Sequence, residues 1–153
     1  MEPKIINLSE EQECEIRYYL DEYNAQHIKY RLDGMLRIGL EAEGKLIAGL
    51  IAYMSVYKIL YVDTVFVDER YRRQGYGRKL IQEMERQAKE QGVNTIRLDT
   101  FNWQGTKFYK ALGYEAVGSY VNEEDDFEET FFCKEDINER HEINYEENNN
   151  FNI

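Results

Sequence analysis

Residues 72–79 (RRQGYGRK) have the residue types and spacing of an anion-binding loop. They follow an apolar run that we predict to be a buried strand, and they open a predicted helix. Free backbone N–H groups and the positive helix end therefore meet at this loop. The two glycines let a ligand approach the backbone because they carry no Cβ. With four cations in eight residues, the loop favours a polyphosphate ligand. The alternative is an ordinary helix start whose arginines face water.

The elements that must hold this loop follow from hydrophobic periodicity and turn residues. We predict strands over residues 4–8, 35–41, 46–57, 59–67, 95–100, 114–120 and 130–133, and helices over 10–27, from 76 to the stop at Gly92, and over 105–112. Ser9 and Gln12 are spaced as a capping box for the first helix. The order β-α-β-β-β-α-β-α-β-β predicts an α/β (α+β) fold with a mixed sheet flanked by helices. We expect one domain over residues 1–136 and a polar, Asn- and Glu-rich tail over 137–153.

Composition excludes several classes of protein. The 153 residues contain no apolar run of the roughly 20 residues that span a bilayer. The net charge is −11, and a negative chain repels phosphate backbones, so we expect no nucleic acid partner. Cys14 and Cys133 form no CxxC pair, which argues against a disulfide framework and against a zinc knuckle, and we expect no metal. The N-terminus has no targeting pattern, so we expect a cytoplasmic protein with no membrane contact.

Two segments together resemble a known family. Residues 67–80 (VDERYRRQGYGRKL) resemble the acetyl-CoA signature, R/Q-x-x-G-x-G/A, of the GNAT superfamily of N-acetyltransferases. Residues 102–114 (NWQGTKFYKALGY) resemble its second motif, with Gly105 where the family usually has Ala. The resemblance extends over residues 4–134 and implies a mixed, mainly antiparallel central sheet. It also implies acetyl-CoA as co-substrate and no metal.

The resemblance implies positions for the cofactor. In that superfamily the pyrophosphate sits on the loop between the central strand and its helix. The backbone groups that would bind it here belong to Arg72, Arg73, Gln74, Gly75, Tyr76 and Gly77. The pantetheine arm would hydrogen-bond to Phe66 and Val67 like an added strand, and Asn102 matches a residue that commonly contacts it.

Two residues acquire catalytic roles from the same resemblance. Tyr109 matches the tyrosine that commonly protonates the leaving thiolate, and a phenol of pKa about 10 keeps its proton at neutral pH. The alternative for Tyr109 is a core aromatic. An alkylammonium of pKa about 10.4 needs a base before it attacks, and Asp63 matches a carboxylate that often serves through water. Burial would have to raise the pKa of Asp63 for that role. Its alternatives are a substrate anchor and an outward-facing strand residue.

Further acidic residues could bear on the acceptor. Residues 122–129 hold six carboxylates, which would attract a cationic amine such as a polyamine, an aminoglycoside or a basic peptide. The alternative is a solubilising hairpin tip. Asp99 and Thr100 end a predicted strand, and they either border the cleft or are ordinary strand-end residues.

The sequence therefore predicts an N-acetyltransferase that moves an acetyl group from acetyl-CoA directly to a primary amine of a small molecule or peptide. The alternative function is a non-catalytic CoA-binding sensor or interaction module. The tail from Ile137 is either loosely ordered or docked on a second subunit, which leaves a homodimer open.

Overall fold

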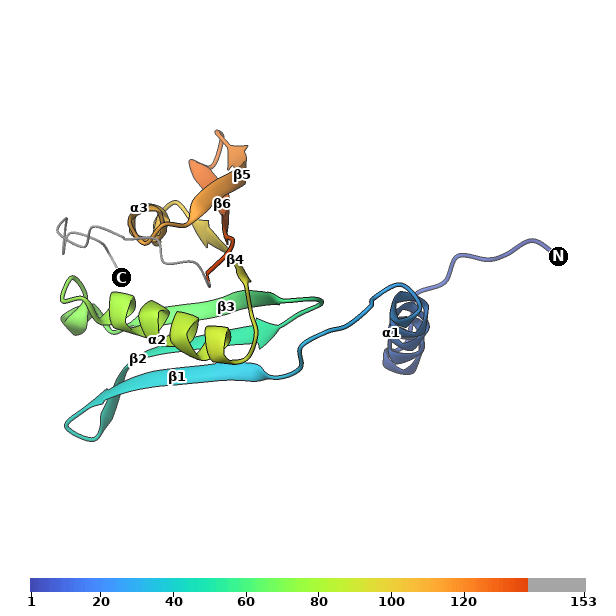
Figure 1. Ribbon diagram of the computed structural model, residues 1–153. Coiled ribbons are helices and arrows are strands. Elements are labelled where there is room, and N and C mark those ends of the chain that lie inside the picture. Colours follow the sequence, from blue (N-terminus) through green and yellow to red (C-terminus); the bar gives the residue numbers. More distant parts are fainter. Residues whose placement is uncertain (138–153) are drawn as a thin grey trace.

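Figure 1 shows the computed structural model of the chain, in which residues 1–137 are described. The helices are α1 (Glu10–Ala25), α2 (Tyr76–Glu90) and α3 (Thr106–Ala111), with a 3-10 helix over Glu69–Tyr71. The strands are β1 (Met35–Ala42), β2 (Lys45–Met54), β3 (Ile59–Val67), β4 (Thr95–Phe101), β5 (Glu115–Asn122) and β6 (Phe127–Lys134). Every predicted element except the first strand is present. In this part of the chain, no helix is long and apolar enough to cross a membrane.

The six strands form one mixed sheet in the order β1-β2-β3-β4-β6-β5. All neighbouring pairs are antiparallel except β3 and β4, which run parallel. α2 connects these two strands, since a parallel pair requires a crossover connection. The predicted mixed, mainly antiparallel α/β fold is therefore confirmed.

The core lies on the face of the sheet that α2 and α3 cover. α2 is amphipathic, and its stripe of Leu80, Ile81, Met84 and Ala88 is buried against this face, as its four-residue spacing predicts. α3 lies on the same face, because the Lys134 ammonium of β6 donates both to Glu85 of α2 and to the carbonyl of Leu112 at the end of α3. One layer of helices thus covers one face of the sheet.

The N-terminal segment departs from the prediction. Lys4–Leu8 forms no strand, because it runs beyond α1, away from the sheet, where no other strand can pair with it (Figure 1). α1 begins with the predicted capping box, in which Ser9 Oγ accepts from Gln12 N and Ser9 N donates to Gln12 Oε1. None of its residues is buried, however, and it stands clear of the sheet (Figure 1). The sequence predicted that this helix flanks the sheet. In the structure α1 does not.

The described residues end one residue past the predicted domain boundary at 136, which stays a prediction. Ile137 is buried, and its N–H donates to the carbonyl of Asn94 at 3.1 Å, so residue 137 packs with the body. The rest of the predicted tail, residues 138–153, lies outside the described residues.

Candidate active site: a cleft between two diverging strands

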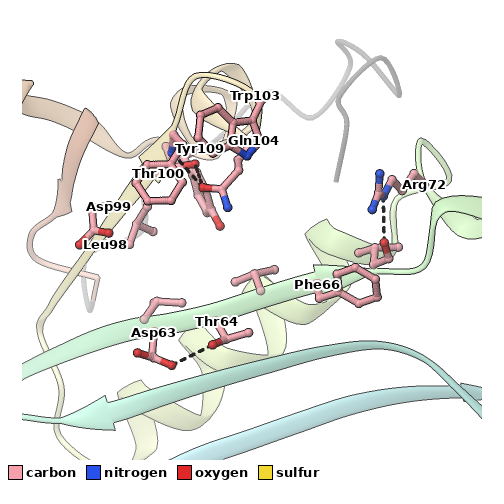
Figure 2. A pocket seen from close by; sticks show the side chains of 14 residues that line it. Asp63, Thr64, Phe66, Arg72, Leu98, Asp99, Thr100, Trp103, Gln104 and Tyr109 are labelled. Atoms are coloured by element: carbon pink, nitrogen blue, oxygen red, sulfur yellow. Dashed lines mark hydrogen bonds between the residues drawn. The ribbon is translucent and has the colours of Figure 1, made fainter. Parts of the chain in front are cut away.

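A cleft opens where β3 and β4 separate. The two strands pair only over Ile59–Tyr61 and Thr95–Arg97. Beyond these residues β4 follows its antiparallel partner β6, so the second half of β3 has β2 on one side and no strand from residues 1–137 on the other. The resulting cleft has a volume of about 680 Å³ (Figure 2). This volume suits a small-molecule ligand, because ligand pockets measure roughly 300–1,000 Å³.

The β3 wall contains Asp63, Phe66 and Val67, three of the residues that the resemblance singled out. The pairing register with β2 shifts between Val62 and Thr64, which leaves Asp63 as the extra residue of a β-bulge. Asp63 is exposed, and its carboxylate accepts a 2.8 Å hydrogen bond from Thr64 Oγ1 (Figure 2). The burial on which a base role for Asp63 depends is therefore not present in this structure.

The predicted anion loop borders this wall. Arg72 lines the cleft, where its guanidinium lies over the Phe66 ring and its Nε donates to the carbonyl of Val67 at 2.9 Å (Figure 2). Arg73 and Gly75 have φ values of +61° and +84°, so the loop turns sharply before α2. The other loop residues, Arg73, Gln74, Gly75, Tyr76 and Gly77, do not line the cleft itself.

The start of α2 differs from the start of α1. α1 has a capping box and three acidic residues in its first turn. α2 has Gly75 at its N-cap with no side-chain cap and no acidic residue in its first turn. The first N–H groups of a helix have no intrahelical partner and carry a partial positive charge, so this end of α2 suits an anion.

The opposite wall comes from the end of β4 and from α3. Tyr109 is buried in the core with its hydroxyl directed toward the cleft (Figure 2), and this burial raises the pKa of the phenol well above its usual range. Gln104 Oε1 accepts from Phe101 N at 2.8 Å and from Thr100 Oγ1 at 3.2 Å. These bonds hold the turn before α3, and they place Tyr109 across the cleft from β3.

Asn102 lies elsewhere. It does not line the cleft, and its side chain bonds to the β5–β6 hairpin. Its Nδ2 donates to the carbonyl of Asp126 at 2.9 Å, and its Oδ1 accepts from Glu128 N at 3.4 Å. Asn102 therefore anchors the acidic turn beside the cleft, and its contact with pantetheine stays a prediction.

The structure adds residues that sequence reasoning did not single out. Trp103 and Gln104 both line the cleft. They lie within the second motif, but the motif gave neither residue a role. Tyr61 donates a 2.8 Å hydrogen bond to Asp99, a half-buried carboxylate of the cleft wall. This bond, with burial, raises the pKa of Tyr61 to about 12. Alternation along β3 and β4 placed Tyr61 and Asp99 on one face, but only their parallel pairing brings them together.

No group of three or more His, Cys, Asp or Glu side chains among residues 1–137 is arranged to hold a metal ion. The cleft lining itself presents the exposed carboxylate of Asp63, the half-buried carboxylate of Asp99, the buried phenol of Tyr109 and the guanidinium of Arg72.

Comparison with known proteins identifies the fold and the relatives. Residues 5–114 match the sequence model of the acetyltransferase (GNAT) family. A blasticidin-S acetyltransferase of Streptomyces morookaense is 32% identical over 77 residues, which cover 50% of this chain and 56% of that protein. The chain thus spans about half the length of the curated relatives that it matches.

Solved structures match over more of the chain. A crystal structure of an acetyltransferase from Bacillus cereus superposes with a TM-score of 0.81 at 28% identity, covering 87% of this chain and 97% of that one. Residues 34–153 make up less than 87% of the chain, so the matched part must also include some of residues 1–33. An aminoglycoside 6'-N-acetyltransferase complexed with coenzyme A has the same fold, with a TM-score of 0.60 at 16% identity, covering 83% of this chain and 89% of that one.

Proposed function

The chain belongs to the acetyltransferase (GNAT) family, and from that premise we propose that it transfers an acetyl group from acetyl-CoA to a primary amine in the cleft between β3 and β4. The observation that carries this proposal is the divergence of the two strands, which exposes the edge of β3 opposite the hydroxyl of Tyr109. An extended ligand can bind a free strand edge through its amide groups, as pantetheine would.

We propose that the cofactor enters along the anion loop. Its pyrophosphate would bind the backbone of residues 72–77 at the uncapped start of α2, where Arg73 adds positive charge. Its pantetheine arm would then lie along Phe66 and Val67. Because Arg72 already donates to the Val67 carbonyl, the arm must either share that oxygen or displace the arginine.

The proposed reaction is a direct attack. The neutral amine attacks the thioester carbonyl, the C–N bond forms, the C–S bond breaks, and the electron pair leaves on the CoA sulfur. Tyr109 would donate its hydroxyl proton toward this thiolate as general acid, and the raised pKa of Tyr109 keeps the phenol protonated throughout the neutral range. The amine loses one proton and the thiolate gains one, so the reaction neither consumes nor releases a proton overall.

We propose two roles for the carboxylates. Asp63, exposed on the bulge of β3, would accept the amine proton through water or anchor a cationic acceptor. Asp99 is the second candidate, because it is half-buried in the cleft wall. The six carboxylates of residues 122–129 lie on the turn that Asn102 holds beside the cleft, so we propose that they favour cationic acceptors.

One observation favours the alternative function, a CoA-binding sensor without turnover. The cleft has an exposed carboxylate at the predicted base position, and an exposed carboxylate is a weak base at neutral pH. We further propose a cytoplasmic homodimer. Cys14 and Cys133 are both free thiols, as a reducing compartment favours.

The first experiment compares turnover with binding. Acetyl-CoA-dependent thiol release is measured over a panel of polyamines, aminoglycosides, amino acids and lysine peptides. For Tyr109→Phe we expect kcat to fall about 10²- to 10⁴-fold, the usual contribution of a general acid, with acetyl-CoA affinity retained. Tyr114→Phe is the matched control, since it removes an equally buried hydroxyl that bonds to Glu85 and does not line the cleft, so it should lower stability and leave kcat unchanged. Acetyl-CoA binding without release for any amine would favour the sensor instead.

The second experiment tests the cofactor loop. S-acetylpantetheine lacks the pyrophosphate, so Arg73→Ala should raise KM for acetyl-CoA about 10- to 150-fold and leave KM for S-acetylpantetheine unchanged, because a hydrogen bond to a charged group contributes about 1.5–3 kcal/mol. Arg70→Ala is the control, since it removes a neighbouring arginine that lies outside residues 72–77 and bonds to Asp68. Equal effects of Arg73→Ala on both thioesters would exclude this placement of the pyrophosphate.

A further inference from the structure

Four aromatic side chains meet beside the cleft. Phe101 ends β4, Trp103 lies on the turn before α3, and Tyr120 and Phe127 belong to the β5–β6 hairpin. Their ring centroids lie 5.0 Å apart from Phe101 to Trp103, 5.4 Å from Phe101 to Phe127 and 6.2 Å from Phe127 to Tyr120. Phe101 and Trp103 also line the cleft, and Figure 2 shows Trp103 on the wall across from β3. This aromatic cluster is therefore continuous with the candidate active site.

The described part of the chain leaves the aromatic cluster open. Trp103 and Tyr120 are 62% and 56% exposed, and Phe101 and Phe127 are half-buried. No cation of residues 1–137 lies over any of the four rings. Single exposed aromatic residues are ordinary on a protein surface, but a group of four beside a cleft indicates a surface that binds a ligand.

A carboxylate stands within the aromatic cluster. Glu129 of β6 pairs in register with Phe101 of β4 and with Tyr120 of β5, so the three side chains form one row on the face of the sheet opposite α2 and α3. Glu129 is half-buried, and its carboxylate has no hydrogen bond or ion pair with any of residues 1–137. A partly desolvated carboxylate without a partner favours a cationic ligand, because pairing offsets the cost of its burial.

The cations on the neighbouring elements do not neutralise Glu129. Arg97 of β4 lies two rows away on the same face, and its guanidinium lies over a tyrosine ring of β3. Lys134 of β6 is buried on the other face and bonds to α2. Lys107 and Lys110 are exposed on α3, which also covers that other face. Arg72, on the opposite wall of the cleft, donates to a β3 carbonyl. The aromatic cluster is therefore a site for an external cation.

We propose that the aromatic cluster and Glu129 bind a guanidinium group of the acceptor, whose primary amine reaches into the cleft. This inference rests on the proposed function, because it names the acceptor class of the same cleft. A guanidinium is planar and weakly hydrated, so it stacks on aromatic rings and pairs with a carboxylate through two parallel N–H donors. A compact ammonium is strongly hydrated and gains less from the same rings.

The spacing of the rows sets the length of this acceptor. Asp99, the half-buried carboxylate of the cleft wall, pairs with Phe131 in the row next to that of Glu129. Two such rows are two residues, or about 6.6–6.8 Å, apart along a strand. A linker of about four methylenes spans this distance. A guanidinium bound at Glu129 therefore places the amine of such an acceptor near Asp99, inside the cleft.

The first test compares acceptors that share a primary amine and differ at the other end. These are (4-aminobutyl)guanidine, 1,5-diaminopentane and pentylamine, which end in a guanidinium, an ammonium and a methyl group. In acetyl-CoA-dependent thiol release, we expect kcat/KM to be highest for the guanidine and about tenfold or more above that for pentylamine.

Variants assign this preference to the aromatic cluster. Glu129→Gln should lower kcat/KM for the guanidine about tenfold, the loss of a hydrogen bond to a charged group. Trp103→Ala should lower it about 2- to 5-fold, the range of an exposed cation–π contact. Both variants should change kcat/KM for pentylamine little. Glu115→Gln is the matched control, since Glu115 pairs with Cys133 on the same face, away from the rings, and it should preserve the order of the three acceptors.

The second test measures binding without turnover. Trp103 is the only tryptophan of the chain, so its fluorescence reports on this surface alone. Butylguanidine has no primary alkylamine to acetylate, and we expect it to quench Trp103 saturably, with Glu129→Gln raising its dissociation constant about tenfold. Such quenching without acetyl transfer to any amine would support the guanidinium site and refute the proposed function.

Two results would overturn the inference. Equal kcat/KM for the three acceptors, with Trp103 fluorescence unchanged by butylguanidine, would show that acetyl transfer proceeds without a guanidinium site, and the proposed function would stand. A Trp103 emission maximum already typical of a buried indole, and unmoved by butylguanidine, would show that another segment or chain covers the rings. Both results come from the wild-type protein, so neither depends on whether a variant folds.

Discussion

An ion pair between the buried Lys134 and the half-buried Glu85 joins the two halves of the sheet on either side of the cleft. Lys134 of β6 is 8% exposed, and its ammonium donates to Glu85 of α2 at 2.9 Å and to the carbonyl of Leu112 at 3.0 Å. The Tyr114 hydroxyl donates to the same Glu85 oxygen at 2.9 Å. β3 and β4 pair over only three residues each, and this network bonds α2, which packs on β1–β3, directly to the β4–β6–β5 half.

We predict that Glu85→Ala lowers the free energy of unfolding by about 3–5 kcal/mol, the range found when one partner of a buried pair is removed. The loss arises because Lys134 keeps its charge in a buried position with the Leu112 carbonyl as its remaining acceptor, while the Tyr114 hydroxyl loses the Glu85 oxygen to which it donates. Urea unfolding followed by circular dichroism measures the change. If the unfolding free energy depends on urea concentration with the same slope in both proteins, the mutation has not altered the surface that unfolding exposes.

Two further variants make the reasoning refutable. Glu83→Ala removes a carboxylate from the same helix that is paired with Arg86 at the surface, so it should have a much smaller effect. Glu85→Leu combined with Lys134→Met removes both charges and should recover most of the stability, because a buried pair replaced by apolar side chains is often neutral. If Glu85→Ala destabilises no more than Glu83→Ala, the network does not connect the two halves.

Three other predictions concern the cleft and its loop. Asp99→Asn should lower the pKa of Tyr61 from about 12 toward 10, as read by ultraviolet titration, and the stability that this bond contributes should be complete below pH 10 and lost as the pH rises through about 12. Gly75→Ala should cost about 1–2 kcal/mol of unfolding free energy, because φ at Gly75 is +84°, although a Cβ there would meet no atom within 4 Å. Asn102→Ala should lower the melting temperature and leave KM for acetyl-CoA unchanged, whereas a raised KM with unchanged melting would support the predicted pantetheine contact instead.

Local patterns determined most of the fold. The four-residue stripe of α2, the β-branched run of β3 and the capping box at Ser9 each depend on residues close in sequence, so periodicity and hydrogen-bonding chemistry were sufficient. The prediction of a strand over Lys4–Leu8 was wrong, because a local pattern does not show whether a partner strand is present. The segment has strand-forming residues, but a strand also needs a neighbour, and that neighbour depends on where α1 directs the chain.

Within the site, the sequence by itself determined the loop chemistry, with its arginines, its glycines and the helix that follows. Only the tertiary structure decided which of these groups face the cleft. Arg72 reaches the Val67 carbonyl, Asn102 bonds to a hairpin 24 residues away, and Asp63 stays exposed on a bulge. Such contacts depend on strand divergence and register, and these are set by packing between distant segments, which no local pattern encodes.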